Sequence, residues 1–353
     1  MSTRLAITPA LTGAMLFALT AAPDSFRDPL LAKLREHLSA QTIARGITAL
    51  KWLCGLGLAR FANEWFSELA QNNFRLTSEK HRYDWPKEVA VITGATGGFG
   101  SLMSKELAAK GVRIIAIDIR DELPSDMKMN PKIHYFKCDV TDRKAVAQVA
   151  AKIREQHGDP SILINNAGIS GDGTIFEQTP EQLEKIFKLN VISHYYTVQE
   201  FLPAMARNKK GHVVTIASVA SFVSPPGLVP YANTKVAALG FHEGLQMEAR
   251  IFHDAKEVKF SVVHPTFANT PMAAPFANQL AAAKAKVIEP WMVSNAVVKQ
   301  ILSGRGKQII VAPGTEAVVY LRSLPIWLSQ GLLQLADRNL KVCLTYAALT
   351  LRS

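Results

Sequence analysis

Short apolar runs rich in β-branched residues recur between residues 89 and 313, and amphipathic segments separate them. The runs that we interpret as strands are residues 89–93, 113–118, 133–137, 161–164, 211–217 and 307–313. In the intervening segments apolar residues recur at helical spacing, as in Val146, Val149 and Ile153, and again from residue 186 to residue 205. This alternation predicts one α/β domain, which a leader precedes and a tail follows.

The leader alternates between apolar and polar stretches. Residues 5–22 carry no charge, and as a helix they would reach about 27 Å, slightly less than a hydrocarbon core of about 30 Å. A membrane-associated helix and a cleaved signal peptide both fit this stretch. Residues 46–59 suit either an interfacial helix or a helix packed on the α/β domain. Residues 66–87 turn polar, and we interpret them as a linker.

The first strand of the α/β domain runs into a turn with four glycines. Gly94, Gly98 and Gly100 lack the Cβ that would keep a pyrophosphate away from the backbone. A helical pattern begins at Ser101, so the free N–H groups of its first turn and the positive end of its dipole face the same place. The arrangement predicts that this turn binds a nucleotide.

An acidic residue, Asp118, ends the second strand. A carboxylate at this place can accept hydrogen bonds from both hydroxyls of an adenosine ribose, and it would repel a 2′-phosphate. Together with the glycine turn it predicts a dinucleotide cofactor, with NAD(H) preferred. Arg120 follows two residues later, and its guanidinium can pair with a phosphate, so NADP(H) stays as a second option.

Polar residues also follow the third and fourth strands. Asp139 can meet the adenine amino group, or Asp139 or Thr141 can cap the next helix. The fourth strand runs into Asn165-Asn166-Ala167-Gly168, where asparagine tolerates left-handed φ and bonds neighbouring backbone. We therefore expect Asn166 to brace the sheet beside the cofactor.

Tyr231 and Lys235 are four residues apart in a helical segment, so they share one helix face. An ammonium beside a phenol favours the phenolate and should lower its pKa from about 10 toward neutrality. Such a tyrosine can exchange a proton with a carbinol oxygen. Ser218, at the end of the fifth strand, can hydrogen-bond the same oxygen, and Lys235 can reach the nicotinamide ribose.

Charge and cysteine content limit the classes of partner. The chain of 353 residues has a formal net charge of +11 with no arginine- or lysine-rich block. This distribution argues against nucleic acid and fits a weak attraction to anionic lipid headgroups. Cys54, Cys138 and Cys343 are odd in number and lack metal-ligand spacing, which argues for a reducing compartment and against disulfides or a bound metal.

With these motifs in place, residues 88 to about 272 resemble the short-chain dehydrogenase/reductase family. Residues 93–100 are similar to the family's Thr-Gly-x-x-x-Gly-x-Gly cofactor turn, which includes Thr96 and Phe99, and residues 165–168 are similar to its Asn-Asn-Ala-Gly turn. The resemblance implies a Rossmann-type, doubly wound sheet of seven mostly parallel strands with helices on both faces.

The resemblance also implies a catalytic tetrad of Asn190, Ser218, Tyr231 and Lys235. In the family the asparagine holds a water in a proton relay to the lysine, and the tyrosine is the acid and base. Thr270 falls on a threonine that contacts the nicotinamide carboxamide. Residues 266–290 would form a lid over the substrate, with an apolar wall made of Met272, Phe276, Val223 and Leu228.

The layout of the whole chain resembles the membrane-associated branch, which includes microsomal retinol dehydrogenases and lipid-droplet steroid 17-beta-dehydrogenases. It implies a membrane-associating leader and linker (1–87), a catalytic domain (88–315) and an apolar, basic helical tail (316–353). The expected enzyme interconverts a lipophilic alcohol and its ketone or aldehyde at the endoplasmic reticulum membrane or a lipid droplet. Its catalytic domain would face the cytosol, and a homodimer is compatible with the sequence.

Two alternatives stay open from the sequence. The same chemistry fits a pathway to a secondary metabolite such as a polyketide or terpenoid. A protein that binds NAD at a membrane without catalysis is a second alternative, which the complete tetrad disfavours.

Overall fold

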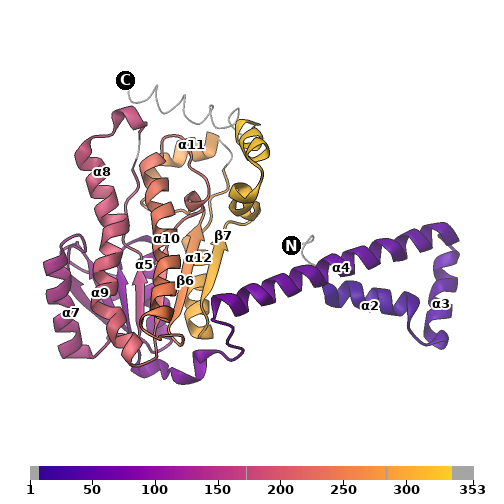
Figure 1. Cartoon of the computed structure of the whole chain (residues 1–353), viewed down its shortest axis with the longest axis horizontal. Helices are drawn as coiled ribbons and strands as arrows, with labels where there is room; N and C mark the ends of the chain where they lie inside the picture. The colour runs from indigo at the N-terminus through magenta and orange to yellow at the C-terminus, as the bar shows by residue number, and fades with distance from the viewer. Residues whose placement is uncertain (1–7, 172, 283–284, 336–353) are drawn as a thin grey trace. The chain divides into compact units, whose positions relative to one another are not determined.

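The computed structural model describes residues 8–171, 173–282 and 285–335. The chain divides between Phe74 and Arg75 into two compact units. The described part of the first unit is helical, and the second unit contains the sheet (Figure 1).

The described part of the N-terminal unit consists of α2 (Pro9–Thr20), α3 (Asp24–Arg35) and α4 (Ala40–Gln71). The hydroxyl of Ser39 caps α4 by accepting a hydrogen bond from the N–H of Thr42. The 32 residues of α4 span about 48 Å. The linker predicted to begin at residue 66 is therefore wrong in its first part. No proline interrupts this stretch, and an Arg60–Glu64 ion pair one turn apart supports the helix.

The N-terminal unit exposes many large apolar side chains. Helices α2 and α4 pack together where a Cβ on Gly13 would lie 3.8 Å from Cys54 Sγ. The large apolar side chains that these two helices leave exposed are Leu11, Met15, Phe17, Trp52, Leu56, Leu58, Phe61, Trp65 and Phe66. In the predicted apolar stretch 5–22, residues 5–7 lie outside the described residues. Among the helices that the structure describes, none is both long and apolar enough to cross a membrane.

Seven strands form the sheet of the second unit. They are β1 (Val89–Thr93), β2 (Arg113–Asp118), β3 (Ile133–Lys137), β4 (Ile162–Asn165), β5 (His212–Ile216), β6 (Lys259–Pro265) and β7 (Lys307–Val311). Their order is β3-β2-β1-β4-β5-β6-β7, and every neighbouring pair is parallel. The expected seven-stranded Rossmann-type sheet is confirmed. The sequence analysis did not identify β6, which is buried along its whole length.

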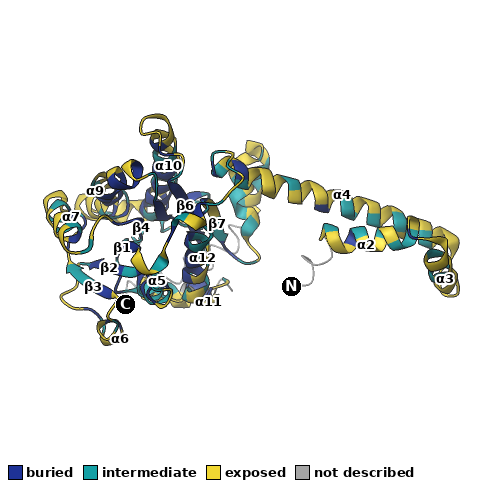
Figure 2. Ribbon diagram, turned by 90° about the horizontal axis from the view of Figure 1, so that it is seen from below, coloured by how far each residue is buried: buried dark blue, intermediate teal, exposed yellow. Residues whose placement is uncertain are grey.

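Helices cover both faces of this sheet. The longer ones are α5 (Gly98–Ala109), α7 (Arg143–His157), α8 (Pro180–Phe187), α9 (Ser193–Arg207), α10 (Val229–Ile251) and α12 (Pro290–Ser303), and the short ones are α6 (Ser125–Lys128) and α11 (Ala277–Ala282). Ala90 and Ile92 of β1 point into a core with α5 and α12. Val89 and Val91 point into a second core with α7, α9 and α10. Figure 2 shows the strands buried between helices whose outer faces are exposed.

The strand order creates a crevice at the carboxyl ends of β1 and β4. The chain proceeds from β1 outward to β3 and then returns to the other side of β1 as β4. The loops that follow these two strands consequently run in opposite directions. In doubly wound sheets ligands bind at such a switch point, and the glycine turn and the Asn-Asn-Ala-Gly turn both lie there.

Residues 75–87 belong to the α/β unit and are not a free linker. Glu79 is buried, its N–H donates to the carbonyl of Gly304, and its carboxylate lies 3.8 Å from the buried Lys259 Nζ of β6. Arg75 forms a 2.9 Å ion pair with the same carboxylate. The compact unit thus begins thirteen residues before the predicted boundary, because a buried ion pair attaches this segment to the sheet.

The chain after β7 continues as η7 (Glu316–Ser323) and a helix over residues 326–335. Arg322 Nε donates a 3.1 Å hydrogen bond to the carbonyl of Phe222. Ile326 and Trp327 expose 80% and 75% of their surface. The predicted helical tail is therefore seen up to residue 335, and its remainder, residues 336–353, lies outside the described residues.

Candidate active site

A cavity of about 630 Å³ opens at the carboxyl edge of the sheet. The expected site residues that line it are Gly94, Gly98, Phe99, Asp118, Asp139, Asn166, Ser218, Tyr231, Lys235 and Thr270. Thr96, Gly100 and Asn190 lie behind the lining and contact residues that belong to it. The fold therefore gathers the predicted site residues around one space, from the carboxyl ends of the six strands β1 to β6, from α5 and α10, and from the turn that contains Asn190.

The glycine turn fits against its neighbours without room for side chains. Gly94 and Gly98 adopt φ values of 62° and 45°, which disfavour any residue with a Cβ. A Cβ on Gly94 would lie 2.9 Å from Ala167 Cα, and one on Gly100 would lie 2.2 Å from the Gly94 carbonyl oxygen. The turn thus leaves bare backbone facing the cavity at the start of α5.

Asp118 is tied to the glycine turn. Its Oδ2 accepts hydrogen bonds from the N–H and the hydroxyl of Thr96, and its Oδ1 accepts from the N–H of Ile119 and Arg120. The Arg120 guanidinium lies over the turn, 3.5 Å from the position of a Cβ on Gly97. A carboxylate and a guanidinium therefore flank the end of the cavity that the carboxyl ends of β2 and β3 form.

Asp139 lines the cavity, but neither it nor Thr141 caps the following helix. The cap of α7 is Asp142, whose Oδ1 accepts from the N–H of Lys144 and Ala145. Asp139 instead accepts a hydrogen bond from the N–H of Thr141 within the loop. The predicted cap is wrong by up to three residues, because the loop after β3 makes an Asx turn before the helix begins.

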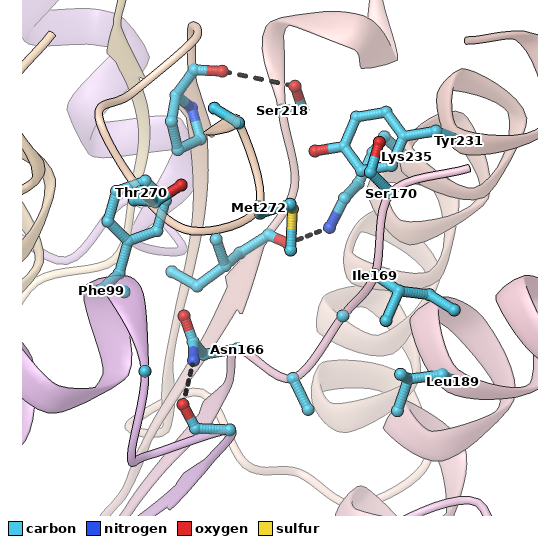
Figure 3. Close-up of a pocket in the computed structure, with 18 of the residues that line it drawn as sticks. Phe99, Asn166, Ile169, Ser170, Leu189, Ser218, Tyr231, Lys235, Thr270 and Met272 are labelled. Atoms are coloured by element: carbon cyan, nitrogen blue, oxygen red, sulfur yellow. Dashed lines mark hydrogen bonds between the residues drawn. The ribbon is translucent and has the colours of Figure 1, made fainter. Parts of the chain in front are cut away.

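Asn166 joins the turn after β1 to the turn after β4. Its Nδ2 donates to the carbonyl oxygens of Thr93 and Gly94 at 2.9 and 3.0 Å, and Figure 3 draws one of these two bonds. In return, Thr93 Oγ1 accepts hydrogen bonds from the N–H groups of Asn166 and Ala167. The bracing expected of Asn166 is present. Sequence reasoning missed the matching role of Thr93, because this residue follows an unbroken apolar run and looked like an ordinary strand end.

Ser218, Tyr231 and Lys235 face the same side of the cavity (Figure 3). Tyr231 and Lys235 lie on α10, and Lys235 Nζ is 5.5 Å from the centre of the Tyr231 ring. Lys235 Nζ also donates to the carbonyl of Ile216 at 2.9 Å. Ser218 opens the short helix η5 (Val219–Ser221) after β5, and its hydroxyl donates to the Pro265 carbonyl at 3.3 Å.

The pKa values at this cluster correct one expectation. Burial raises the pKa of Tyr231 above its usual value, and a hydrogen bond with Ser218 offsets part of this rise. Burial also lowers the pKa of Lys235 to about 8. The expected lowering of the phenol's pKa by the ammonium is therefore not found, because the loss of solvent around the hydroxyl outweighs other influences.

Asn190 is fully buried in η4 (Lys188–Ile192), a π-helical turn between α8 and α9. Its Oδ1 accepts from the N–H of Ile169, and its Nδ2 donates to the Ile169 carbonyl and to Thr234 Oγ1. Thr234 in turn donates to the carbonyl of Tyr231. The Asn190 side chain thus connects the loop after β4 to the turn of α10 that carries Tyr231.

The other end of the cavity is mainly apolar. Val223, Leu228, Met272 and Phe276, the expected wall, all line it. Sequence reasoning missed further lining residues, namely Ile169, Ser170, Lys185 and Leu189. Lys185 and Leu189 are four residues apart, so helical spacing was the available signal. Thr270 borders the glycine turn, with its methyl group 3.6 Å from the position of a Cβ on Gly98.

The residues present fit a dinucleotide. Cβ atoms would fill the cradle at Gly94 and Gly98, and the free N–H groups of α5 begin there. Asp118 stands where an acceptor for the ribose hydroxyls is expected, and Lys235 and Tyr231 line the same cavity.

Comparisons with known proteins agree with this geometry. The sequence model described as "short chain dehydrogenase" matches residues 88–281. Dehydrogenase RED2 of Cochliobolus heterostrophus is 35% identical over 236 residues, which are 66% of this chain and 85% of that protein. Estradiol 17-beta-dehydrogenase 11 of Homo sapiens is 33% identical over 273 residues, which are 76% and 88% of the two chains.

A solved structure shares the fold. The ligand-free aldohexose dehydrogenase of Thermoplasma acidophilum aligns with a TM-score of 0.56 and 21% identity, covering 65% of this chain and 93% of that one. The sequence matches go further than the fold, because the family model spans residues 88–281, which contain the glycine turn and the Tyr231–Lys235 pair. The chain therefore belongs to the short-chain dehydrogenase family, and it is an oxidoreductase that acts on CH–OH groups.

Proposed function

We propose that this enzyme interconverts a lipophilic alcohol and its ketone or aldehyde at a lipid surface, with NAD(H) as the preferred cofactor. The observation that carries the proposal is one cavity with a glycine cradle and Asp118 at one end and Ser218, Tyr231 and Lys235 beside an apolar wall at the other. The substrate would be similar to a retinoid, a steroid or a fatty alcohol.

In the proposed reaction Tyr231 takes the proton of the substrate hydroxyl during oxidation and returns a proton to the carbonyl oxygen during reduction. The bound nicotinamide accepts or supplies the hydride at the substrate carbon. Ser218 would turn its hydroxyl from the Pro265 carbonyl, 3.3 Å away, to donate a hydrogen bond to the reacting oxygen, and it lowers the pKa of Tyr231. Lys235 binds the nicotinamide ribose and places its positive charge behind the phenol, 5.5 Å from the ring centre.

Asn190 has a bracing role in this proposal. Its side-chain oxygen and amide group are bonded to Ile169 and Thr234. The water of the proton relay would therefore be held by the backbone at Asn190. A π-helical turn leaves a main-chain carbonyl without its usual helical partner, and such turns are frequent at functional sites.

The proposed cofactor preference rests on Asp118. Its carboxylate is held in place by four hydrogen bonds, from the N–H and hydroxyl of Thr96 and the N–H groups of Ile119 and Arg120, so it cannot turn away from a 2′-phosphate, and its negative charge repels one. The Arg120 guanidinium, which lies over Gly97, would pair with the 2′-phosphate of NADP(H) and so partly offset the repulsion from Asp118. Thr270 would contact the carboxamide, because it borders Gly98 inside the cavity.

The proposed lipid surface rests on the N-terminal unit. Trp52, Phe61 and Phe66 expose 71%, 62% and 59% of their surface on one long helix. The net charge of +11 adds an attraction to anionic headgroups. Amphipathic aromatic side chains and basic residues together favour a helix that lies in a membrane interface.

A substrate screen tests the catalytic part of the proposal. The purified full chain is incubated with each cofactor and with fatty alcohols, steroids, retinoids and their carbonyl forms, and cofactor absorbance is followed. We expect turnover with apolar substrates and little with sugars or polyols. Turnover restricted to polar alcohols would overturn the substrate class, and cofactor binding without turnover of any alcohol would favour the non-catalytic alternative.

Vesicle flotation tests the location separately. The full chain and a chain of residues 75–353 are mixed with vesicles that contain phosphatidylcholine with or without phosphatidylserine. We expect the full chain to float with the vesicles, in a larger fraction when phosphatidylserine is present. We expect the shortened chain to remain in the unbound fraction. Equal behaviour of the two chains would contradict a role of the leader in lipid binding.

A further inference from the structure

A histidine lies directly behind the Ser218 backbone. His264, near the end of β6, is completely buried, and its Nδ1 lies 2.9 Å from the carbonyl oxygen of Ser218. Its Nε2 lies 3.2 Å from Gln308 Nε2 on β7. The imidazole therefore connects three adjacent strands: it lies near the end of β6 and contacts Ser218 after the end of β5 and Gln308 near the start of β7.

The partners of His264 define its protonation state. A carbonyl oxygen can only accept, so Nδ1 must carry a proton and donate to Ser218. The Nε2 atom faces the amide nitrogen of Gln308, so it accepts, and the ring is neutral. Burial lowers the pKa of His264 to about 4, and Lys235 contributes in the same direction. The ring keeps this tautomer across the physiological range.

Ser218 depends on the end of β6 for its position. Its hydroxyl donates to the carbonyl of Pro265, the residue after His264 (Figure 3), and its own carbonyl accepts from His264 and from the N–H of Ser221. The Ser218 backbone is extended, with φ at −166° and ψ at 162°. Within η5, the N–H of Ala220 also donates to the Ser218 hydroxyl. Outside η5, this residue is anchored by a side chain and a carbonyl from two consecutive residues of β6.

We propose that His264 is a positioning residue of the active site, whose Nδ1–H holds the Ser218 main chain so that the serine hydroxyl meets Tyr231. This inference rests on the proposed roles of Ser218 and Tyr231. It assigns His264 no contact with substrate or cofactor. Phe222, whose ring centre is 4.7 Å from that of His264, packs against the imidazole and belongs to the loop beside the cavity.

Two substitutions of His264 separate the effect of losing the Nδ1–H donor from the effect of changing the side-chain volume. His264→Leu keeps an apolar volume and loses the donor, whereas His264→Asn can place an amide N–H near the position of Nδ1–H. We expect His264→Leu to lower kcat by about 10- to 100-fold, because small misplacements of catalytic groups have effects of this size. We expect His264→Asn to recover most of the loss, and the dissociation constant of NADH to change less than threefold (~0.65 kcal/mol) in both.

A pH profile supplies a readout that a merely structural role would not move. The interaction with Ser218 lowers the pKa of Tyr231. Displacement of Ser218 should therefore shift the alkaline limb of the pH profile of kcat/KM for alcohol oxidation to higher pH. Lys235 is the charged group beside the phenol, and it is intact in every variant. We expect His264→Leu and Ser218→Ala to shift the limb alike, and the double variant to shift it no further than Ser218→Ala.

His212 provides the matched control. It is also fully buried in the sheet and bonds a serine, with Nε2 2.9 Å from Ser261 Oγ, but it stands at the start of β5, away from the cavity. His212→Leu should lower the melting temperature and leave kcat and the pH limb unchanged. If His264→Leu does not fold, Gln308→Leu takes its place: it removes the partner of His264 Nε2, and it should lower kcat and shift the pH limb in the same direction, whereas His264→Asn should do neither.

Two results would overturn the inference: unchanged kcat in a folded His264→Leu enzyme, or additive shifts of the pH limb in the double variant. Failure of the proposed function would look different. In that case Tyr231→Phe itself would retain turnover. A Tyr231→Phe enzyme without turnover beside a fully active His264→Leu enzyme would refute only the role of His264.

Discussion

Asp118 Oδ2 accepts hydrogen bonds from both the N–H and the hydroxyl of Thr96, at 3.0 and 2.7 Å. The end of β2 and the turn after β1 are thereby held together by one carboxylate oxygen. The charge of Asp118 and its position have separable consequences: the charge acts on a phosphate, and the bonds to Thr96 shape the turn.

The first prediction separates these two contributions to cofactor preference. Asp118→Asn and Asp118→Ala should both raise the ratio of kcat/KM for NADP(H) to that for NAD(H), because each removes the repulsion of a 2′-phosphate. Thr96→Val keeps the charge and loses one bond to it. It should weaken both cofactors without changing their ratio. A wild-type enzyme that already prefers NADP(H) would show that Arg120 dominates.

The second prediction concerns the proton donor. Tyr231→Phe removes one oxygen and leaves the glycine cradle and Lys235 in place, so NADH should still bind. Loss of general acid–base catalysis should lower turnover by about 100- to 10,000-fold. Fluorescence titration of NADH and steady-state kinetics on the same preparation measure the two quantities. Near-normal turnover would exclude Tyr231 from the chemistry.

The third prediction concerns pH. Oxidation of an alcohol needs the Tyr231 phenolate, and burial raises the pKa of this tyrosine, so the oxidation rate should rise as pH rises through the alkaline range. Reduction needs the phenol and should fall over the same range. Ser218→Ala removes an interaction that lowers this pKa. It should therefore move both limbs to higher pH, which profiles of kcat/KM will test.

The fourth prediction compares two glycines. A Cβ on Gly100 would lie 2.2 Å from the Gly94 carbonyl oxygen and 2.9 Å from Asn166 Nδ2, so Gly100→Ala should lower the free energy of unfolding by about 1–3 kcal/mol and weaken NADH binding. Gly240 lies in the middle of α10 with nothing within 4 Å of its Cβ position. Gly240→Ala should stabilise the protein by up to about 1 kcal/mol. Denaturant unfolding measures both, and equal effects would contradict the packing argument.

The fifth prediction concerns the start of the α/β unit. A chain of residues 75–353 keeps Glu79 opposite Lys259, whereas one of residues 88–353 leaves Lys259 buried without its carboxylate. Breaking a buried ion pair in this way costs about 3–5 kcal/mol. We expect the longer chain to unfold cooperatively at a higher temperature. Similar melting temperatures would show that residues 75–87 add little.

Local patterns were the part of the site that the sequence could predict. The glycine turn, Asp118 and the Tyr231–Lys235 pair each lie within one strand, turn or helix, so spacing alone indicates which side chains share a face. The seven-stranded, mostly parallel sheet was predicted from the family resemblance. The strand β6 was missed, because a lysine at its start and a histidine and proline at its end obscure the apolar run.

Contacts between distant segments required the tertiary structure. His264 bonds Ser218 across 46 residues, and Asn190 bonds Thr234 across 44. No periodicity in the chain encodes such pairs, because they arise where parallel strands and packed helices place their ends side by side.

The sequence by itself determined the chemistry that this protein carries: a backbone cradle, an acid that can bind ribose, and a phenol one helical turn from an ammonium. Only the tertiary structure decided how those groups behave. Burial sets the direction of the Tyr231 and Lys235 pKa shifts, and burial depends on what packs over a side chain. A charge or hydroxyl has the same identity everywhere in the chain, but its free energy depends on the solvent and partners that folding leaves it.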